Sequence, residues 1–214
     1  MLLAQNKLDE AVQPLRSAIL LEPGIAESFR LMGQVHLRQG RESAGEKAMA
    51  VYQKVKTFEK DVELYQERLR SDPDDSDAHF SLGYIYARLG FSAVALPHYG
   101  RAVTINPGHL RALNNLGNIY FRTGNLDQAA AAYEQILRRD ADHVGALITL
   151  GQVYLSQQRT EEAVEVLQRV IAQNEGQIAA HQGLAEAYKR LGEIARSEEH
   201  RKIAGQLQED RKGK

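Results

Sequence analysis

The 214-residue chain contains no cysteine, and this absence excludes disulfides, thiolate metal sites and cysteine nucleophiles. It has only five prolines and no low-complexity tract, so long linkers are not expected. No stretch approaches the roughly 18 consecutive apolar residues of a membrane-spanning helix, and the first residues turn polar too early for a secretory signal peptide. These absences do not identify the cellular compartment, and the cytoplasm is the default expectation.

Net charge is also small. A formal charge of −1 gives no reason to expect nucleic acid or an acidic membrane surface as the main partner. Hydrophobic residues make up 43% of the chain and charged residues 26%, which predicts a folded, soluble protein. The sequence also lacks a Gly-rich phosphate loop and an HExxH metal motif. We therefore expect no cofactor and no enzymatic activity.

What the chain does contain is a five-residue motif that recurs every 34 residues. Its first three copies read Leu-Gly-X-Ile/Val-Tyr, and the fourth reads Leu-Ala-Glu-Ala-Tyr. The copies occupy residues 82–86, 116–120, 150–154 and 184–188. A fixed period of this length indicates a repeat array.

Further positions repeat with the same period. Seven residues after the small residue of the motif the chain has Gly90, Gly124, Gln158 and Gly192. Twelve residues after it come Ala95, Ala129, Ala163 and Ser197. Sixteen residues after it come Tyr99, Tyr133, Leu167 and Arg201. The pattern resembles the tetratricopeptide repeat (TPR), although the first aromatic position of that family holds Phe29, His79, Leu113, Leu147 and His181 here.

Hydrophobic spacing agrees with this resemblance. In the unit at residues 76–107, Leu82, Ile85, Tyr86 and Leu89 follow the i, i+3, i+4, i+7 spacing of one helix face. Gly90 is expected to end that helix, and a second periodic run follows it. Small residues, such as the motif's glycine, allow the two helices to approach closely. Because one hairpin cannot bury its apolar face alone, the units must stack. We predict an all-α fold, a right-handed α-solenoid of TPR hairpins.

One helix is predicted to be over-long. Between residues 42 and 70 apolar residues alternate by three and four, which is a heptad stripe, and this unit exceeds one period by 16 residues. The first half of this helix fits the hairpin at residues 25–40 and the second half fits the helix at 76–89, so it is expected to serve both and to join two modules. The alternative use of the stripe is self-association as a coiled coil.

The repeat pattern also predicts the domain organisation. It divides the chain into 1–24 (second helix of a partial TPR), 25–75 (TPR with the extended second helix), 76–109, 110–143, 144–177 (three regular TPRs) and 178–214 (a TPR-like unit with a polar capping helix). A half-repeat exposes an apolar edge, which favours a chain that is longer upstream; a lone capping helix is the alternative.

The histidines have structural explanations. His79 and His181 occupy the first packing position of their repeats, where we expect them to fill the core. His109 and His143 lie one period apart in corresponding loops, but a metal site needs three or four ligands. No other ligands are placed near them, so no metal site is predicted.

The family resemblance implies a binding surface on the first helix of each repeat, which lines the concave groove of TPR arrays. The mapped groove positions that we predict to bind a partner are Phe80, Tyr84, Arg88, Asn114, Asn115, Asn118, Arg122, Gln152, Gln182, Glu186 and Arg190. Amides can pair with both the N–H and C=O groups of an extended peptide. Asn115 occupies a position where TPR proteins commonly carry such an asparagine. The alternative is that the asparagines merely solvate this face.

Charge on this surface suggests two further possibilities. Arg38, Arg88, Arg122 and Arg190 share one repeat position and could form a basic stripe for an acidic segment or a C-terminal carboxylate, but basic residues are frequent there in TPRs. The Lys/Asn clamp that binds chaperone C-terminal tails is absent, since Phe80 and Tyr84 replace its first pair.

Together these features predict a non-catalytic scaffold that binds a protein or peptide segment in the groove, without nucleic acid and without direct membrane insertion. Two alternatives stay open. The chain could be a docking arm of a larger enzyme, similar to glycosyltransferases or sulfotransferases with TPR regions, or a structural subunit of a membrane-associated complex.

Overall fold

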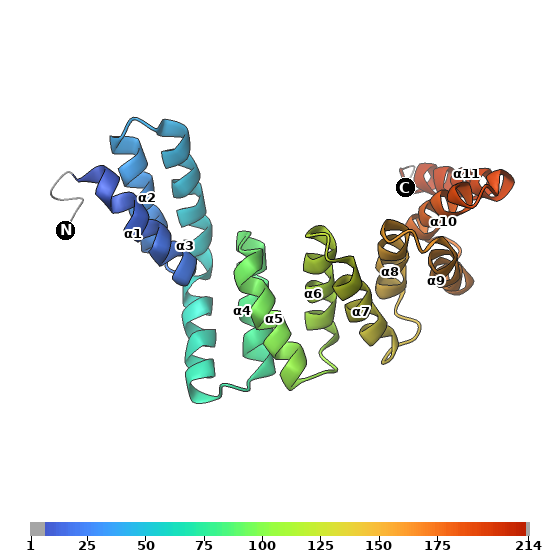
Figure 1. Ribbon diagram of the computed structural model, residues 1–214, viewed down its shortest axis with the longest axis horizontal. Coiled ribbons are helices and arrows are strands. Elements are labelled where there is room, and N and C mark those ends of the chain that lie inside the picture. Colours follow the sequence, from blue (N-terminus) through green and yellow to red (C-terminus); the bar gives the residue numbers. More distant parts are fainter. Residues whose placement is uncertain (1–6, 213–214) are drawn as a thin grey trace. The chain divides into compact units, whose positions relative to one another are not determined.

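The computed structural model describes residues 7–212, and every regular element in that range is a helix, as predicted. The helices of this range are α1 (Leu8–Leu21), α2 (Ala26–Arg38), α3 (Glu42–Ser71), α4 (Ser76–Leu89), α5 (Ser92–Ile105), α6 (Leu110–Arg122), α7 (Leu126–Leu137), α8 (Val144–Ser156), α9 (Thr160–Gln173), α10 (Ile178–Arg190) and α11 (Ile194–Lys212) (Figure 1). Predicted features in residues 1–6 and 213–214 lie outside the described range.

The helices form two compact units that divide between Pro107 and Gly108. In the first unit, α2 pairs with α3 and α4 pairs with α5, while α1 packs on α2. In the second unit the hairpins α6–α7, α8–α9 and α10–α11 follow one another, and α7 contacts α8 as α9 contacts α10. Within each unit, neighbouring hairpins therefore pack against one another, which confirms the expected stacking there.

The repeated glycine sets the spacing within each regular hairpin. A Cβ atom on Gly83 would lie 2.8 Å from Cδ1 of Tyr99, and one on Gly117 would lie 2.9 Å from Cε2 and Cζ of Tyr133. The same holds for Gly151, whose added Cβ would lie 2.7 Å from Cγ of Leu167. The first helix thus approaches the large residue of the second helix as closely as a glycine permits.

The first helix of each regular repeat ends in a left-handed residue. Gly90 follows α4 with φ of +90°, and Gly124 and Gly192 adopt the same conformation. Gln158 holds the equivalent position with φ of +64°. Because an L side chain is strained in this region, Gln158 is notable as the one non-glycine residue of the described chain with a positive φ.

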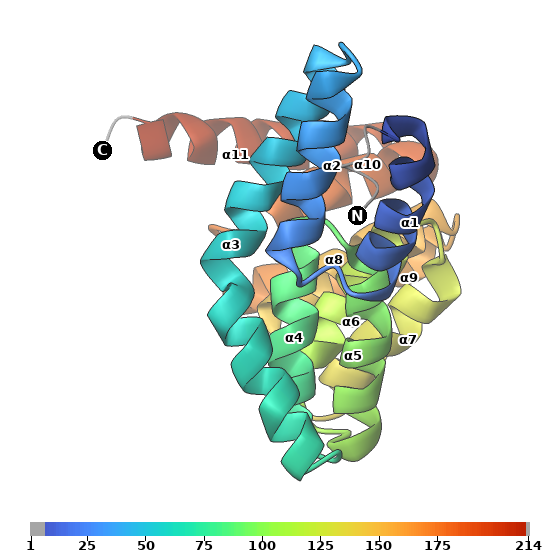
Figure 2. The same ribbon diagram turned by 90° about the vertical axis from the view of Figure 1, so that its left-hand side faces the viewer.

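Helix α3 confirms the predicted long helix and spans 30 residues, or about 45 Å at 1.5 Å per residue. Figure 2 shows it running alongside both α2 and α4, and it contacts each of them. The heptad stripe is buried or half-buried along its whole length, with Val55 and Val62 most deeply covered. The stripe is therefore used within the chain.

A shared cluster links the two hairpins that α3 serves. Phe29 of α2 and Val55 of α3 are buried in it, and Leu89 and Phe91 of the α4–α5 hairpin pack against them. The rings of Phe29 and Phe91 stack with centroids 5.7 Å apart. As a result α3 lies inside the first unit, and the division of the chain falls after α5 rather than at the long helix.

The last helix differs from the other second helices. In α11 only Ser197 and Ala204 are buried, so its outer face is polar, as expected for the end of an array. Across residues 7–212, no helix combines the length and the apolar character that crossing a membrane requires.

Candidate partner-binding surface

The predicted groove residues lie on four first helices, which belong to two different units. Phe80, Tyr84 and Arg88 lie on α4 in the first unit. The others lie on α6, α8 and α10 in the second unit. Each unit is therefore described by itself.

On α4, three groove residues spaced by four form a continuous ladder along one face. Phe80 is 7% exposed and its ring lies 5.9 Å from that of Tyr99, so it belongs to the hairpin core. Tyr84 stacks on Phe80 at 6.3 Å and is 40% exposed. The guanidinium of Arg88 lies 5.8 Å from the Tyr84 ring centroid and Nη1 donates to its hydroxyl at 3.3 Å. The ladder presents a pre-oriented aromatic ring and a cation to solvent.

On α6, the asparagine positions are graded in exposure. Asn114 and Asn115 are half-buried, whereas Asn118 and Arg122 are exposed. The Oδ1 atom of Asn118 accepts a hydrogen bond of 2.8 Å from the hydroxyl of Tyr133. Burial raises the pKa of Tyr133 to about 12, so its hydroxyl remains a donor. This bond fixes the orientation of the Asn118 side chain. Its amide nitrogen is then on the side away from Tyr133 and can act as a donor.

On α8 and α10, the groove positions combine free amides with one internal ion pair. Gln152 and Gln182 are exposed. Glu186 and Arg190 form an ion pair of 2.8 Å, and Nη1 of Arg190 also donates to the carbonyl of Leu155 at 2.5 Å. Arg190 therefore ties α10 to the end of α8. Arg88 likewise contacts Tyr84. Both arginines therefore already have partners within the chain, which argues against a basic stripe made of free cations.

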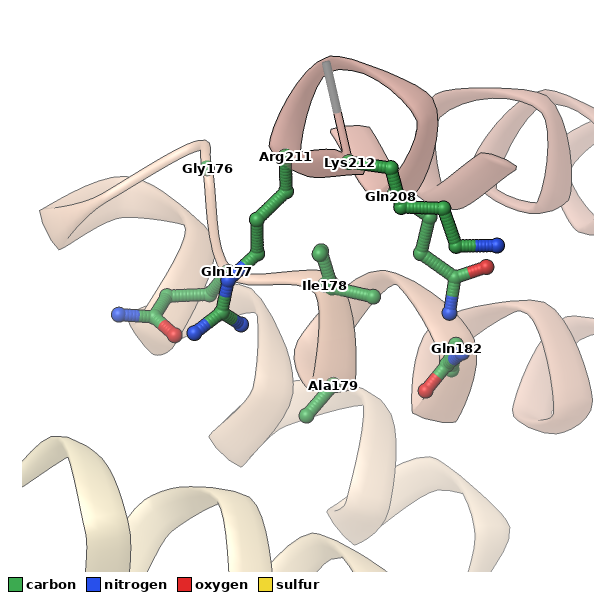
Figure 3. A pocket seen from close by; sticks show the side chains of 8 residues that line it. All are labelled: Gly176, Gln177, Ile178, Ala179, Gln182, Gln208, Arg211 and Lys212. Carbon is green, nitrogen blue, oxygen red and sulfur yellow. The ribbon is translucent and has the colours of Figure 1, made fainter. Parts of the chain in front are cut away.

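An open pocket of about 490 Å³ lies where the start of α10 meets the end of α11, and it was not predicted. Ile178 and Ala179 line it beside Gln182, while Arg211 and Lys212 reach over it from α11 (Figure 3). Sequence reasoning missed it because α11 has no apolar periodicity that would place its side chains against α10.

Histidines take roles that the sequence only partly indicates. The Nδ1 atoms of His109 and His143 accept hydrogen bonds from the backbone N–H of Ala112 and Ala146 at 3.2 and 3.1 Å. They are therefore N-caps of α6 and α8. Within residues 7–212, no group of three or more potential ligands is arranged to hold a metal ion.

The two histidines that we expected to fill the core are indeed at the helix interface. His181 is 3% exposed and His79 is half-buried. Each faces a second histidine, His98 or His200, on the following helix. These partners were missed because they occupy positions that are apolar in the other repeats.

Comparison with solved structures identifies the fold. A crystal structure of MamA superimposes with a TM-score of 0.67 at 20% identity, covering 86% of this chain and 98% of that one. A MamA RS-1 double mutant gives 0.67 at 20% identity, covering 88% and 97% of the two chains. A MamA fragment from Desulfovibrio magneticus RS-1 gives 0.64 at 20% identity, covering 86% and 96%. At this identity the likeness concerns the fold alone.

Sequence comparison gives the family. No curated protein sequence matches the chain. The family model described as tetratricopeptide repeat matches at residues 62–109, 86–143, 114–178 and 148–200, which together span well over half of the sequence. These matches cover the last third of α3, the helices α4 to α10 and the start of α11. The chain therefore belongs to the tetratricopeptide repeat family.

Proposed function

We propose that this chain is a non-catalytic scaffold that binds a partner protein on the first helices of its repeats, which are α4 in the first unit and α6, α8 and α10 in the second. Repeats of this family form extended surfaces that serve protein recognition. The division into the six units predicted from the sequence is part of this proposal.

One recurring arrangement carries the proposal. The residue after the motif's Gly or Ala is exposed in all four repeats, although both of its neighbours are buried. We call these four residues the +1 row: Tyr84, Asn118, Gln152 and Glu186. One helical turn later a second exposed position recurs, the +5 row: Arg88, Arg122, Ser156 and Arg190. Asn118 and Arg190 also bond to neighbouring helices, but all eight side chains are exposed, and we propose that a partner contacts them.

The chemistry of the two rows favours a polar, extended segment. Amides such as those of Asn118 and Gln152 can donate to a peptide carbonyl and accept from a peptide N–H. Tyr133 holds the Asn118 side chain in one orientation, which lowers the entropy that binding must remove. Tyr84 adds a rigid aromatic contact, a residue type that often dominates binding energy. Self-association through α3 would need its other face, where Leu64 is 56% exposed.

The test is affinity purification from the native source with mass spectrometry, using wild-type and variant baits. Asn115→Ala/Asn118→Ala and Gln152→Ala remove groove amides, and Gln128→Ala removes an exposed amide from the second helix α7 as the matched control. We expect both groove variants to lower recovery of the wild-type partner by about tenfold, which corresponds to about 1.4 kcal/mol. Unchanged recovery, with helicity intact by circular dichroism, would overturn the proposal.

A further inference from the structure

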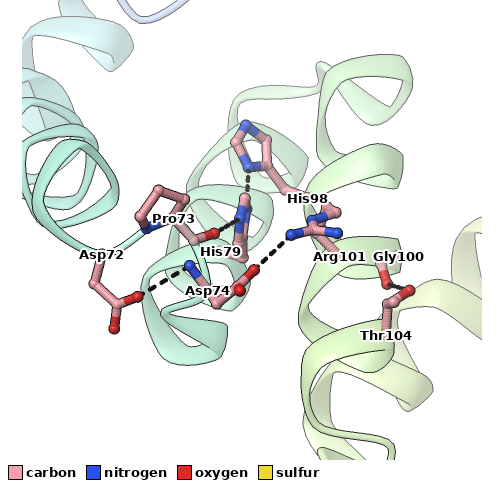
Figure 4. Close-up of polar contacts among 8 residues, drawn as sticks. All are labelled: Asp72, Pro73, Asp74, His79, His98, Gly100, Arg101 and Thr104. Atoms are coloured by element: carbon pink, nitrogen blue, oxygen red, sulfur yellow. Dashed lines mark hydrogen bonds and ion pairs between the residues drawn. The ribbon is translucent and has the colours of Figure 1, made fainter.

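Two histidine pairs occupy equivalent places three repeat periods apart. His79 of α4 faces His98 of α5 with the two Nδ1 atoms 3.2 Å apart (Figure 4). His181 of α10 faces His200 of α11 with the two Nδ1 atoms 2.8 Å apart. The pairs belong to the first and the last of the four hairpins that carry the motif, and one pair lies in each unit.

The surroundings of the two pairs are also duplicated. The Nε2 atom of His79 lies 3.2 Å from the carbonyl oxygen of Pro73, and that of His181 lies 2.9 Å from the carbonyl oxygen of Glu175. The second histidine of each pair stacks on the motif's tyrosine. His98 lies 5.6 Å from Tyr86 and His200 lies 5.6 Å from Tyr188, measured between ring centroids.

These contacts determine where the protons are. A carbonyl oxygen can only accept, so the first-helix histidine must donate from Nε2, and its Nδ1 in the neutral ring is then an acceptor. The second-helix histidine must therefore donate from Nδ1. Each pair is satisfied when both rings are neutral. Protonation of both rings would place two N–H groups against each other.

Charge on the second-helix ring is opposed by its environment. Burial, and then the neighbouring His79, lower the pKa of His98 to about 4. Burial and then His181 lower the pKa of His200 as well, and Glu199 partly opposes this shift. The folded hairpins therefore favour the neutral pairs.

Other charged groups near the first pair are already matched. Asp74 pairs with Arg101 at 2.7 Å, and Asp75 pairs with Arg68 of α3 at 2.6 Å. From the end of α1, Glu22 acts on the hydroxyl of Tyr86 and raises its pKa, less than burial does.

Near the second pair, neighbouring groups contact Tyr188 rather than the imidazoles. Arg196 of α11 lies 5.4 Å from the Tyr188 ring centroid, and Gln168 of α9 donates to its hydroxyl at 2.8 Å. Glu199 is the carboxylate that favours a charged His200.

The two intervening repeats supply the comparison within the same chain. At the positions of the histidine pairs they carry Leu113 with Ala132 and Leu147 with Val166. All four of these residues are buried. The interface can thus be filled by apolar side chains, and the histidines add sensitivity to protons that packing does not require.

We propose that the two histidine pairs are acid-sensitive latches, which hold the hairpins α4–α5 and α10–α11 closed while neutral and release them as the pH falls below neutral. The intervening hairpins α6–α7 and α8–α9 have no such latch. The latches concern conformational stability and do not depend on the proposed partner.

The direction in which stability changes with pH follows from proton binding. The unfolded chain takes up protons below the ordinary histidine pKa of about 6.5, whereas His98 in the folded hairpin resists them. Stability from the first latch is complete above about pH 6.5 and is lost progressively as the pH falls toward about 4. Each proton taken up on unfolding shifts the unfolding equilibrium by up to about tenfold per pH unit.

The experiment transfers the chain's own apolar pairs into the latch positions. His79→Leu/His98→Ala copies the pair at residues 113 and 132, and His181→Leu/His200→Val copies the pair at 147 and 166. His36→Gln is the control, because His36 is half-buried but its Nδ1 faces Gln39 at 3.3 Å rather than a histidine. Urea unfolding of the full chain is followed between pH 7.5 and 4.5.

We expect each latch variant to flatten the decline of stability below pH 6.5 and the combined variant to remove most of the histidine-dependent part, while His36→Gln keeps the wild-type slope. In wild-type protein, imidazole NMR should show His98 neutral at pH 5.5 and the pKa of His200 below its ordinary value. A combined variant that declines as steeply as wild type, or either imidazole titrating near 6.5 in the folded protein, would overturn the proposal.

Discussion

Close helix contacts at the motif's glycine predict opposite effects for the same substitution at different glycines. In Gly83→Ala and Gly117→Ala, the new Cβ meets the ring of Tyr99 or Tyr133 at 2.8 or 2.9 Å. Gly100 of α5 and Gly205 of α11 are also helical, but a Cβ added at either meets nothing within 4 Å. Each tight glycine therefore has a matched open glycine in its own unit.

The magnitude follows from two opposing terms. Carbon atoms in good contact lie about 3.5–4.0 Å apart, so the new methyl overlaps the ring by roughly 0.6 Å. The rings have no room to retreat, since Tyr99 is 1% and Tyr133 0% exposed. Overpacking costs about 1–3 kcal/mol, whereas alanine gains about 1 kcal/mol over glycine inside a helix.

The net expectation is a loss of about 0–2 kcal/mol in Gly83→Ala and Gly117→Ala and a gain of about 0.5–1 kcal/mol in Gly100→Ala and Gly205→Ala. The fourth repeat supports this reasoning, because it has Ala185 in place of the glycine together with Arg201 in place of the large packing residue. Urea unfolding monitored by circular dichroism measures the four variants. Equal stabilisation by all four would refute the steric argument.

Two further predictions concern local conformation and the long helix. Gln158→Gly should raise the free energy of unfolding by about 0.5 kcal/mol. The left-handed conformation at this position strains glutamine by more than the conformational entropy that glycine loses on folding. No increase in the urea midpoint would contradict this. Lys60→Pro should destabilise α3 by about 3 kcal/mol and separate the unfolding of the α2–α3 hairpin from that of α4–α5. Lys60→Ala at the same exposed site should do neither. A single unshifted transition in the proline variant would argue against a shared helix.

The fold could be predicted from the sequence because the positions that recur in each repeat are those that pack against each other. The glycine at 83 and the tyrosine at 99 recur together since one makes room for the other, and the structure places them in contact. The long helix was equally accessible, because residues 42–70 contain an unbroken stripe and no proline. The division of the chain after Pro107 was not accessible. Nor was the cluster around Phe29 and Phe91, which holds α3 within the first unit and which no periodicity reports.

Residue type identifies the N-caps of the helices less well than hydrophobic spacing identifies the helices. Asp75 caps α4 by accepting from the backbone N–H of Ala78 at 2.9 Å, as its residue type suggests. At the start of α8 the cap is His143 rather than the nearby aspartates. Asn125 stands at the N-cap position of α7, but its side chain donates to Thr123 instead. Imidazole is an unusual capping acceptor, so residue preference alone could not select it.

The candidate surface was only partly predictable for a related reason. Position in the repeat identifies which residues face away from the core, and this places Tyr84 and Gln152 among the exposed side chains. It does not reveal that Phe80 is buried against Tyr99 or that Arg190 is tied to the carbonyl of Leu155. Those contacts join residues of different helices, and their geometry comes from the packed hairpins.

The most direct measurement is site-specific photo-crosslinking of the full chain in an extract of its native source. A photoreactive residue at Gln152, on the +1 row, is compared with one at Gln128 on α7, which is equally exposed. We predict one discrete crosslinked partner protein from position 152 and none from position 128. No partner from position 152, or the same partner from both positions, would contradict the assignment of the first helices as the binding surface.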